Sequence, residues 1–322
     1  MKIGLFSVLY QALPLEEALD KMKDSGIEAV ELGTGGYPGN HHCNADELLR
    51  SAARRNALLE AVKSRGMIVS ALSVHGNPIH PDPEFAAGSH GAWRKTVRLA
   101  RQLGVEVINV LSGCPGAPSG GKHPNWVTCS WPPDYAEILE WQWAKKVIPY
   151  WKKEARHARD NGVKIAIEMH PGFVVYNPET LLRLREACGE AIGCNFDPSH
   201  LFWQGIDPVQ AIKDLGSAGA MFHVHAKDTY VDAANVQRNG VLDTKHYGDV
   251  INRSWTFRSL GYGQGEKVWR DMISTLRVVG YDYVLSIEHE DPLASTEEGL
   301  AKAVALLQQL IFKEKPGEMF WA

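Results

Sequence analysis

The 322-residue sequence predicts an α/β protein that folds as a single (β/α)8 barrel, or TIM barrel, over residues 1–322. Eight apolar runs of strand length alternate along the chain with eight longer amphipathic stretches, which is the order expected of a barrel. The runs are continuous, as expected of parallel strands that are buried on both faces. Metal-capable side chains at the ends of four runs indicate a functional site at the C-terminal mouth of this barrel.

The bounds of the elements follow from these two patterns. The expected strands cover residues 2–8, 28–32, 67–74, 106–111, 163–168, 193–197, 220–226 and 283–288. The expected helices cover residues 14–25, 45–65, 89–103, 135–161, 178–188, 207–215, 266–279 and 295–312. The alternative is an open doubly wound sheet, which normally carries a glycine-rich phosphate turn after an early strand. Gly33-Thr34-Gly35-Gly36 follows the second strand, but its spacing does not match GxGxxG.

Two connections are much longer than the usual few residues, at 113–134 after strand four and at 228–265 after strand seven. Because both follow strands, we expect both to lie over the barrel mouth, where long loops act as lids or binding surfaces. Tryptophans near these loops could stack on a ligand ring or anchor the loops; they are Trp126, Trp131, Trp203 and Trp255.

The composition is that of a soluble globular protein, with 44% hydrophobic and 22% charged residues. A formal net charge of -4 provides no basic field for nucleic acid. The five cysteines are odd in number and form no CxxC pair, which favours a reducing cytoplasm. No run approaches the roughly 18 apolar residues of a membrane span, so we expect no membrane contact.

Four expected strands end in side chains that can bind a metal ion. The segments are Ile165-Ala166-Ile167-Glu168, Cys194-Asn195-Phe196-Asp197, Met221-Phe222-His223-Val224-His225 and Leu285-Ser286-Ile287-Glu288. Carboxylates and imidazoles are costly to bury alone, and a divalent cation would supply the compensating charge. The residue types suit Mn, Mg or Co, with Zn also possible. His170, His223 and Glu290 each lie two residues from one of these side chains on the same side of the strand and remain alternative ligands.

Two of these segments also form motifs. Asp197-Pro198-Ser199-His200 and His225-Ala226-Lys227-Asp228, together with Glu168 and Glu288, resemble the xylose isomerase-like barrel superfamily, which contains sugar epimerases, inosose dehydratase and endonuclease IV. The resemblance spans nearly the whole chain. It implies one divalent metal ion, Mn in the first instance, held by Glu168, Asp197, His225 and Glu288.

The resemblance also implies roles for residues around the metal. His200 resembles a substrate-binding histidine, Lys227 lies where a polar substrate contact is often found, and His75 resembles another mouth histidine. Further candidates for substrate contacts are His170 beside Glu168, and His246 and Arg258 in the second long loop. The glycines of the segment 261–266 more plausibly serve tight turns than phosphate binding.

A metal that chelates a keto-sugar or polyol favours proton removal next to the carbonyl, with Glu168 and Glu288 as general bases and His200 beside them. This predicts a sugar isomerase or epimerase. The alternative is β-elimination by the same site, as in a 3-keto-glycoside or C-glycoside deglycosidase or an inosose-type dehydratase. An endonuclease IV-like enzyme is disfavoured because residues 109–113 lack a needed histidine. A non-catalytic sugar sensor would not need paired bases.

The expected helix at 135–161 is unusually aromatic, with Trp141, Trp143, Tyr150 and Trp151. These side chains could pack on the barrel or contact another subunit, either a second copy of the chain or a small partner subunit. The expected ligand is a small-molecule sugar or glycoside.

Overall fold

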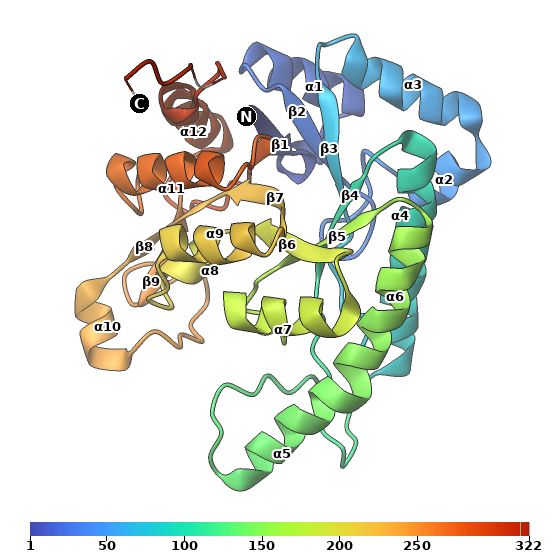
Figure 1. Ribbon diagram of the computed structural model, residues 1–322, viewed down its shortest axis with the longest axis vertical. Helices are drawn as coiled ribbons and strands as arrows, with labels where there is room; N and C mark the ends of the chain where they lie inside the picture. The colour runs from blue at the N-terminus through green and yellow to red at the C-terminus, as the bar shows by residue number, and fades with distance from the viewer. Residues whose placement is uncertain (316, 322) are drawn as a thin grey trace.

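A computed structural model describes residues 1–315 and 317–321 of the chain. Eight parallel strands close into a barrel in the order β1-β10-β7-β6-β5-β4-β3-β2, in which β1 pairs with both β2 and β10 (Figure 1). The strands are β1 (Lys2–Phe6), β2 (Ala29–Gly33), β3 (Ile68–Ser73), β4 (Val107–Leu111), β5 (Lys164–Glu168), β6 (Ile192–Phe196), β7 (Met221–Ala226) and β10 (Val284–Ile287). The predicted single-domain TIM barrel is confirmed.

Each of the eight predicted helical stretches contains helix, with differences at the ends. The helices are α1 (Leu15–Asp24), α2 (Ala45–Arg50), α3 (Ala52–Lys63), α4 (Pro83–Leu103), α5 (Pro133–Trp141), α6 (Ile148–Asp160), α7 (Pro178–Cys188), α8 (Ser199–Phe202), α9 (Pro208–Ser217), α10 (Ala233–Asn239), α11 (Glu266–Val278) and α12 (Thr296–Leu310). The short helices α8 and α10 were not predicted. The predicted helix 45–65 is two helices, because Ser51 is extended and its side chain accepts from Arg54 N as the N-cap of α3. Helix α4 begins before residue 89 because Asp82 caps it.

The predicted helix 135–161 is interrupted between α5 and α6 by a π-helical segment, Gln142–Val147. Trp143 and Trp151 are about 1% exposed, so these two aromatic side chains pack in the core. Helix α5 has no buried residue and extends away from the barrel at the bottom of Figure 1. π-Helical turns inside α-helices are frequent near functional sites.

The long connection after β7 has secondary structure of its own. Strands β8 (Asp228–Val231) and β9 (Trp255–Arg258) form an antiparallel pair, and α10 lies between them in the sequence. The rings of Trp203 and Trp255 stack 4.8 Å apart and pack with Phe257 in a small apolar cluster. These two tryptophans therefore anchor the connection, which was one of the two interpretations of the sequence.

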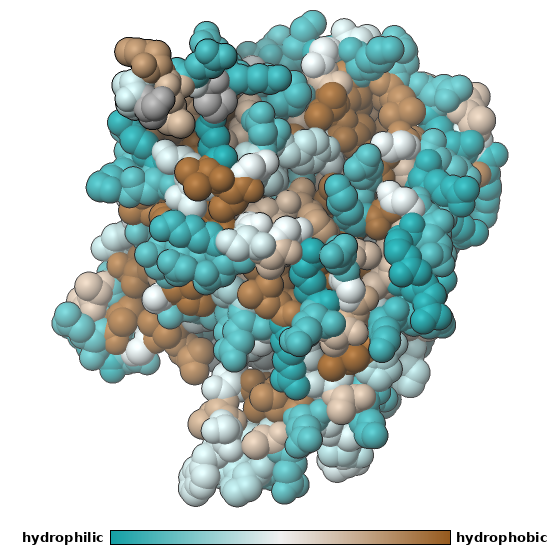
Figure 2. Space-filling view, viewed as in Figure 1, coloured by the Kyte–Doolittle hydropathy of each residue, from teal (hydrophilic) through white to brown (hydrophobic). Residues whose placement is uncertain are grey.

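Outside the barrel, Trp126 packs edge-on against Tyr176, whereas Trp131 is 74% exposed. Figure 2 shows hydrophobic side chains in patches between hydrophilic ones, with one patch at the lower left in the region of α10 and the β8–β9 pair. Among the residues that the structure describes, no helix is long and apolar enough to cross a membrane.

Candidate active site

The four predicted metal ligands meet at the C-terminal mouth of the barrel. Glu168 is the last residue of β5, His225 lies near the end of β7, and Asp197 and Glu288 directly follow β6 and β10. One ligand atom from each of the four lies within 4.8 Å of the others. Parallel strands place their carboxyl ends at one rim of the barrel, and this is why residues so distant in the sequence converge.

The chemistry of this group fits a divalent cation. His225 Nδ1 and Asp197 Oδ2 are buried and have no hydrogen-bond partner among the described residues. His225 Nδ1 lies 3.3 Å from a carboxylate oxygen of Glu168 and 3.3 Å from one of Glu288. Unpaired buried polar atoms are costly, and a cation between them would satisfy the nitrogen and the carboxylates together.

Two carboxylates of the group, those of Glu168 and Glu288, favour the ionised form. Burial alone would raise the pKa of Glu288, but the nearby Lys227 ammonium and His225 outweigh burial and lower the pKa of Glu288 to about 2. Burial acts in the same direction on Glu168, but the neighbouring His200, His225 and His75 side chains hold its pKa well below the usual range. Both side chains are therefore available as anionic ligands and as proton acceptors.

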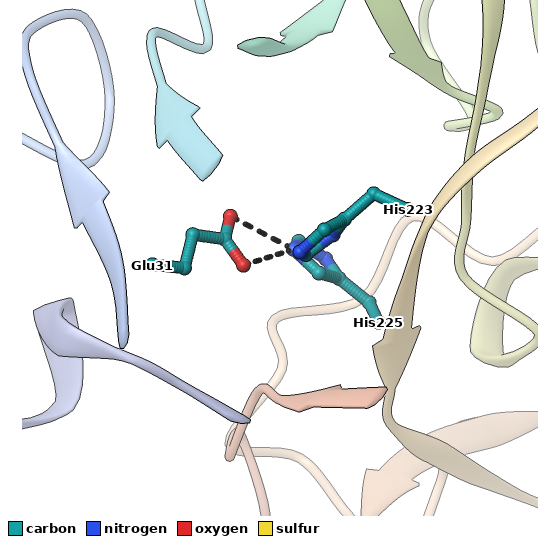
Figure 3. Close-up of side chains that lie close together, drawn as sticks. All are labelled: Glu31, His223 and His225. Carbon is teal, nitrogen blue, oxygen red and sulfur yellow. Dashed lines mark hydrogen bonds and ion pairs between the residues drawn. The ribbon is translucent and has the colours of Figure 1, made fainter. Parts of the chain in front are cut away.

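Glu31, in the middle of β2, fixes the orientation of His225. His225 Nε2 lies 3.0 Å from each oxygen of the fully buried Glu31 carboxylate (Figure 3). The carboxylate also accepts hydrogen bonds from Ser286 Oγ (2.7 Å), Asn109 Nδ2 (2.8 Å) and the Ser73 hydroxyl. Since Nε2 must carry a proton to donate to Glu31, Nδ1 is left free to bind a metal ion.

Sequence reasoning did not identify Glu31. The signal was a carboxylate inside the apolar run Ala29-Val30-Glu31-Leu32, which is unusual for a strand buried on both faces. Glu31 lies on β2 and its partner His225 lies on β7, so their contact can be recognised only once both strands have been placed in the barrel.

His223 belongs to the layer below the four ligands. It is grouped with Glu31 and His225 by distance, but its own hydrogen bonds run elsewhere. Asn195 Nδ2 donates to Glu168 Oε2 (3.1 Å), so the Asn195 carbonyl oxygen is the atom that accepts from His223 Nδ1 (3.0 Å). His223 thus supports Glu168 through Asn195 and does not displace His225 from the group of four.

Three predicted histidines surround Glu168. His200 Nε2 lies 3.2 Å from Glu168 Oε1 and 3.3 Å from Asp197 Oδ2, and His75 Nε2 lies 3.6 Å from Glu168 Oε2. The His170 ring lies 4.2 Å from that of His200. Burial and the neighbouring His200 lower the pKa of His170 to about 3, so this ring is neutral. The structure therefore brings these three candidates together with Glu168.

Lys227 lies on the other side of the group. Its Nζ is 2.8 Å from Glu288 Oε2, 3.4 Å from Asp197 Oδ2 and 3.1 Å from Glu290 Oε2. Although burial opposes the charged form, these carboxylates raise the pKa of Lys227 well above its usual value. Glu290, the alternative ligand to Glu288, is not in the group of four; it pairs with Lys227 and its side chain is 49% exposed.

Two predicted substrate contacts have other partners. The Arg258 Nε lies 3.1 Å from both oxygens of Asp291, and the exposed His246 accepts a hydrogen bond from Gly248 N. The structure does not bring either residue into the group around Glu168.

The glycine-rich segment before α11 surrounds a carboxylate of the protein itself. The buried Asp228 accepts from the backbone N–H groups of Gly261, Gly263 and Gln264 and from Trp269 Nε1. A Cβ at Gly263 would lie 2.3 Å from the backbone of Thr229, so the close approach requires glycine there. These N–H groups are used for the turn, as predicted, and not for a phosphate.

A model of the family described as "Xylose isomerase-like TIM barrel" matches residues 19–310. The chain is 40% identical over 314 residues to an uncharacterised protein, YfiH, of Bacillus subtilis (strain 168), and the match covers 97% of this chain and 99% of YfiH.

Solved structures share the fold at lower identity. The probable 3-DHS dehydratase AsbF of Bacillus anthracis, described as involved in petrobactin synthesis, superposes with a TM-score of 0.66 at 16% identity, over 96% of this chain and 99% of that one. The IOLI protein, solved with a bound zinc atom, superposes with a TM-score of 0.65 at 17% identity, over 98% of this chain and 100% of that one.

Proposed function

The chain belongs to the xylose isomerase-like TIM barrel family, and from that premise we propose that it is a divalent-metal-dependent sugar isomerase or epimerase. Its substrate would be a keto-sugar or polyol, and its reaction would remove a proton from the carbon next to a carbonyl group. One observation carries the proposal: Glu168, Asp197, His225 and Glu288 each offer a ligand atom within 4.8 Å of the others.

Three carboxylates and one imidazole favour a hard divalent ion, and we propose Mn²⁺, with Mg²⁺, Co²⁺ and Zn²⁺ as the other candidates. When bound, such an ion would polarise the substrate carbonyl and stabilise the negative charge that develops when the neighbouring carbon loses its proton. The IOLI protein, which shares the fold, was solved with a bound zinc atom, and this supports metal binding by a barrel of this fold without deciding which ion binds here.

Glu168 and Glu288 are the proposed general bases. They come from β5 and from the end of β10, which are separated in the barrel by β6 and β7, so they approach the substrate from different sides. One carboxylate would accept the proton from the substrate carbon, and the other glutamate, after it has taken up a proton from solvent, would deliver that proton to the opposite face and invert the carbon centre. Return of the first proton to the neighbouring carbon would exchange aldose and ketose. His200, 3.2 Å from Glu168, and Lys227, 2.8 Å from Glu288, would bind substrate oxygens and hold these bases in place.

The arrangement of the histidines favours one alternative. His75, His170 and His200 lie together beside Glu168, and an imidazole next to the base could donate a proton to the leaving group, at oxygen for an O-glycoside or hydroxyl and at carbon for a C-glycoside. The same site would then be a β-elimination lyase, such as a 3-keto-glycoside or C-glycoside deglycosidase or an inosose-type dehydratase. AsbF, described as a probable 3-DHS dehydratase, shares the fold, and that description is compatible with this alternative.

The test is solvent exchange. Protein loaded with Mn²⁺ is incubated with free keto-sugars, inososes and 3-keto-glycosides in deuterated water, and the products are followed by NMR. Deuterium incorporation with an intact carbon skeleton supports the isomerase or epimerase, whereas an enone with released water or aglycone supports the lyase. Glu168→Gln should abolish either reaction. The matched control is Glu28→Gln, because Glu28 is a partly buried glutamate that directly precedes β2 and lies outside the mouth. Metal binding without exchange on any substrate would contradict the proposal and favour a sugar-binding protein.

We also propose that the ligand is a small sugar or glycoside, that the enzyme acts in the cytoplasm, and that any contact with a second copy or a small partner subunit involves α5. The support for α5 is that none of its residues is buried in the described chain.

A further inference from the structure

A pocket of about 380 Å³ opens at the barrel mouth beside the predicted metal ligands. Segments that follow β1, β10 and β7 form it, and the residues that matter here are Leu9, Tyr247, Phe257, Glu290, Asp291 and Pro292. Its size is in the range of small-molecule sites. None of the four ligands lines it, so the pocket is a neighbour of the metal group and not the metal group itself.

Lys227 lies next to both the metal group and the pocket. Its ammonium lies 2.8 Å from Glu288 in the metal group and 3.1 Å from Glu290 at the pocket, and it lies 4.5 Å from the centre of the Phe257 ring, which also lines the pocket. A molecule in contact with Glu288 and Lys227 would therefore lie beside the pocket.

One wall of the pocket is aromatic and held in place. The Phe257 and Tyr247 rings lie 5.8 Å apart and 15° from parallel, and the Arg253 guanidinium lies 4.3 Å from the Tyr247 ring. Phe257 is buried, but Tyr247 remains 52% exposed, so part of this fixed wall is open to a ligand. Rigid aromatic and aliphatic surfaces of this kind bind the C–H faces of a ring with little loss of conformational entropy.

The charged side chains that line the pocket indicate which kind of ligand ring it would bind. Arg258 neutralises Asp291 through two 3.1 Å contacts, which leaves the half-exposed Glu290 carboxylate shared with Lys227. No lysine or arginine lines the pocket among the described residues. Because each carboxylate is paired with one cation, the pair of carboxylates adds little net charge; carboxylates accept hydrogen bonds from hydroxyl groups but offer no donor to a phosphate, so the pocket suits a neutral, hydroxyl-rich ring.

We propose that this pocket binds a second ring of the substrate, so that the substrate is a keto-sugar joined through a glycosidic bond to a neutral hydroxylated ring. The inference rests on the proposed function, because the first ring is placed at the metal group. It adds that a free monosaccharide, or one with a phosphate in the position of the second ring, is a poorer ligand.

The test compares ligands that share one ketose. D-Fructose, the keto-disaccharides lactulose, turanose and isomaltulose, and D-fructose 6-phosphate are titrated into the Mn²⁺-loaded full chain by calorimetry, after Mn²⁺ binding has been measured separately by electron paramagnetic resonance. At least one keto-disaccharide should bind about tenfold more tightly than fructose, and the phosphate no more tightly than fructose.

Tyr247→Ala should weaken binding of that disaccharide several-fold more than binding of fructose. Tyr230→Ala, which removes an exposed tyrosine of the same strand pair outside the pocket, should leave the ratio unchanged. Fructose binding without a gain from the second ring, tighter binding of the phosphate, or equal effects of the two variants would overturn the pocket assignment alone. Mn²⁺ binding with no affinity for any of the sugars would count against the proposed function as well.

Discussion

The Nε2 atom of His225 lies 3.0 Å from both carboxylate oxygens of Glu31, at a point inside the barrel where side chains are usually apolar. This contact determines which imidazole nitrogen faces Glu168 and Glu288. The Glu31 carboxylate is in turn held by Ser286, Asn109 and Ser73, so the histidine is oriented by a layer of side chains outside the group of four.

Glu31→Gln should weaken Mn²⁺ binding about 10- to 100-fold, because the amide accepts a weaker hydrogen bond from Nε2–H and no longer fixes the tautomer. Electron paramagnetic resonance of free Mn²⁺ measures the affinity, and nitrogen NMR shifts of His225 in the metal-free protein report the tautomer. Glu28→Gln, near the start of the same strand, is the control. An unchanged affinity together with an unchanged tautomer would show that His225 is oriented without Glu31.

The contrast between Glu31 and the four proposed ligands shows how far the sequence alone can lead. The barrel and the convergence of Glu168, Asp197, His225 and Glu288 follow from the order of apolar runs, since parallel strands must present their ends at one rim. Glu31 could not be assigned in the same way, because its partner is on a distant strand and the distance across the barrel depends on strand register. The pairing of β8 with β9 was missed for a similar reason: the segments Asp228–Val231 and Trp255–Arg258 are short and far apart in the chain.

Matched substitutions at Glu288 and Glu290 should distinguish the proposed ligand from its neighbour. A ligand at one hundred times its Kd stabilises a protein by about 2.7 kcal/mol, which corresponds to a rise in Tm of a few degrees. We expect Mn²⁺ to raise the Tm of the wild-type protein and of Glu290→Gln, and to have little effect on Glu288→Gln, because only Glu288 is in the group of four. Chelation with EDTA should reverse the shift. Scanning calorimetry is the measurement, and the opposite pattern in the two variants would assign the ligand to Glu290.

Asp228 should be among the residues most important for stability outside the metal group. Its buried carboxylate satisfies the N–H groups of Gly261, Gly263 and Gln264, which lie in a partly exposed turn, and the buried Trp269 indole. Asp228→Ala would leave these donors unpaired, at roughly 1–3 kcal/mol for each buried donor that water cannot reach. We expect a loss of at least about 3 kcal/mol in the free energy of unfolding by urea. Asp228→Asn keeps one oxygen acceptor and should lose less; equal losses for the two variants would mean that packing, and not hydrogen bonding, holds the turn.

Gln142 should control the order of the long connection after β4. It begins the π-helical segment, is fully buried, and its Nε2 lies within hydrogen-bond distance of the carbonyl oxygens of Pro115 (3.2 Å), Gly116 (2.9 Å) and Asn125 (2.8 Å). A single side chain between α5 and α6 therefore contacts the beginning and the middle of the connection 113–134. Gln142→Leu has a similar volume but no donor, and it would leave these carbonyls to water.

We expect faster hydrogen exchange and faster proteolytic cleavage within residues 113–134 of Gln142→Leu, with the barrel strands unaffected, since local opening depends on few contacts there. Mass spectrometry of the exchanged peptides measures the first effect and limited proteolysis the second. Gln210→Leu, an exposed position on α9, is the control. If the loop forms part of the substrate site, the variant should also raise KM more than it lowers kcat, because the loop would bind substrate without contacting the reacting carbon. Unchanged exchange across 113–134 would show that Trp126 and its contact with Tyr176 are sufficient to hold the loop.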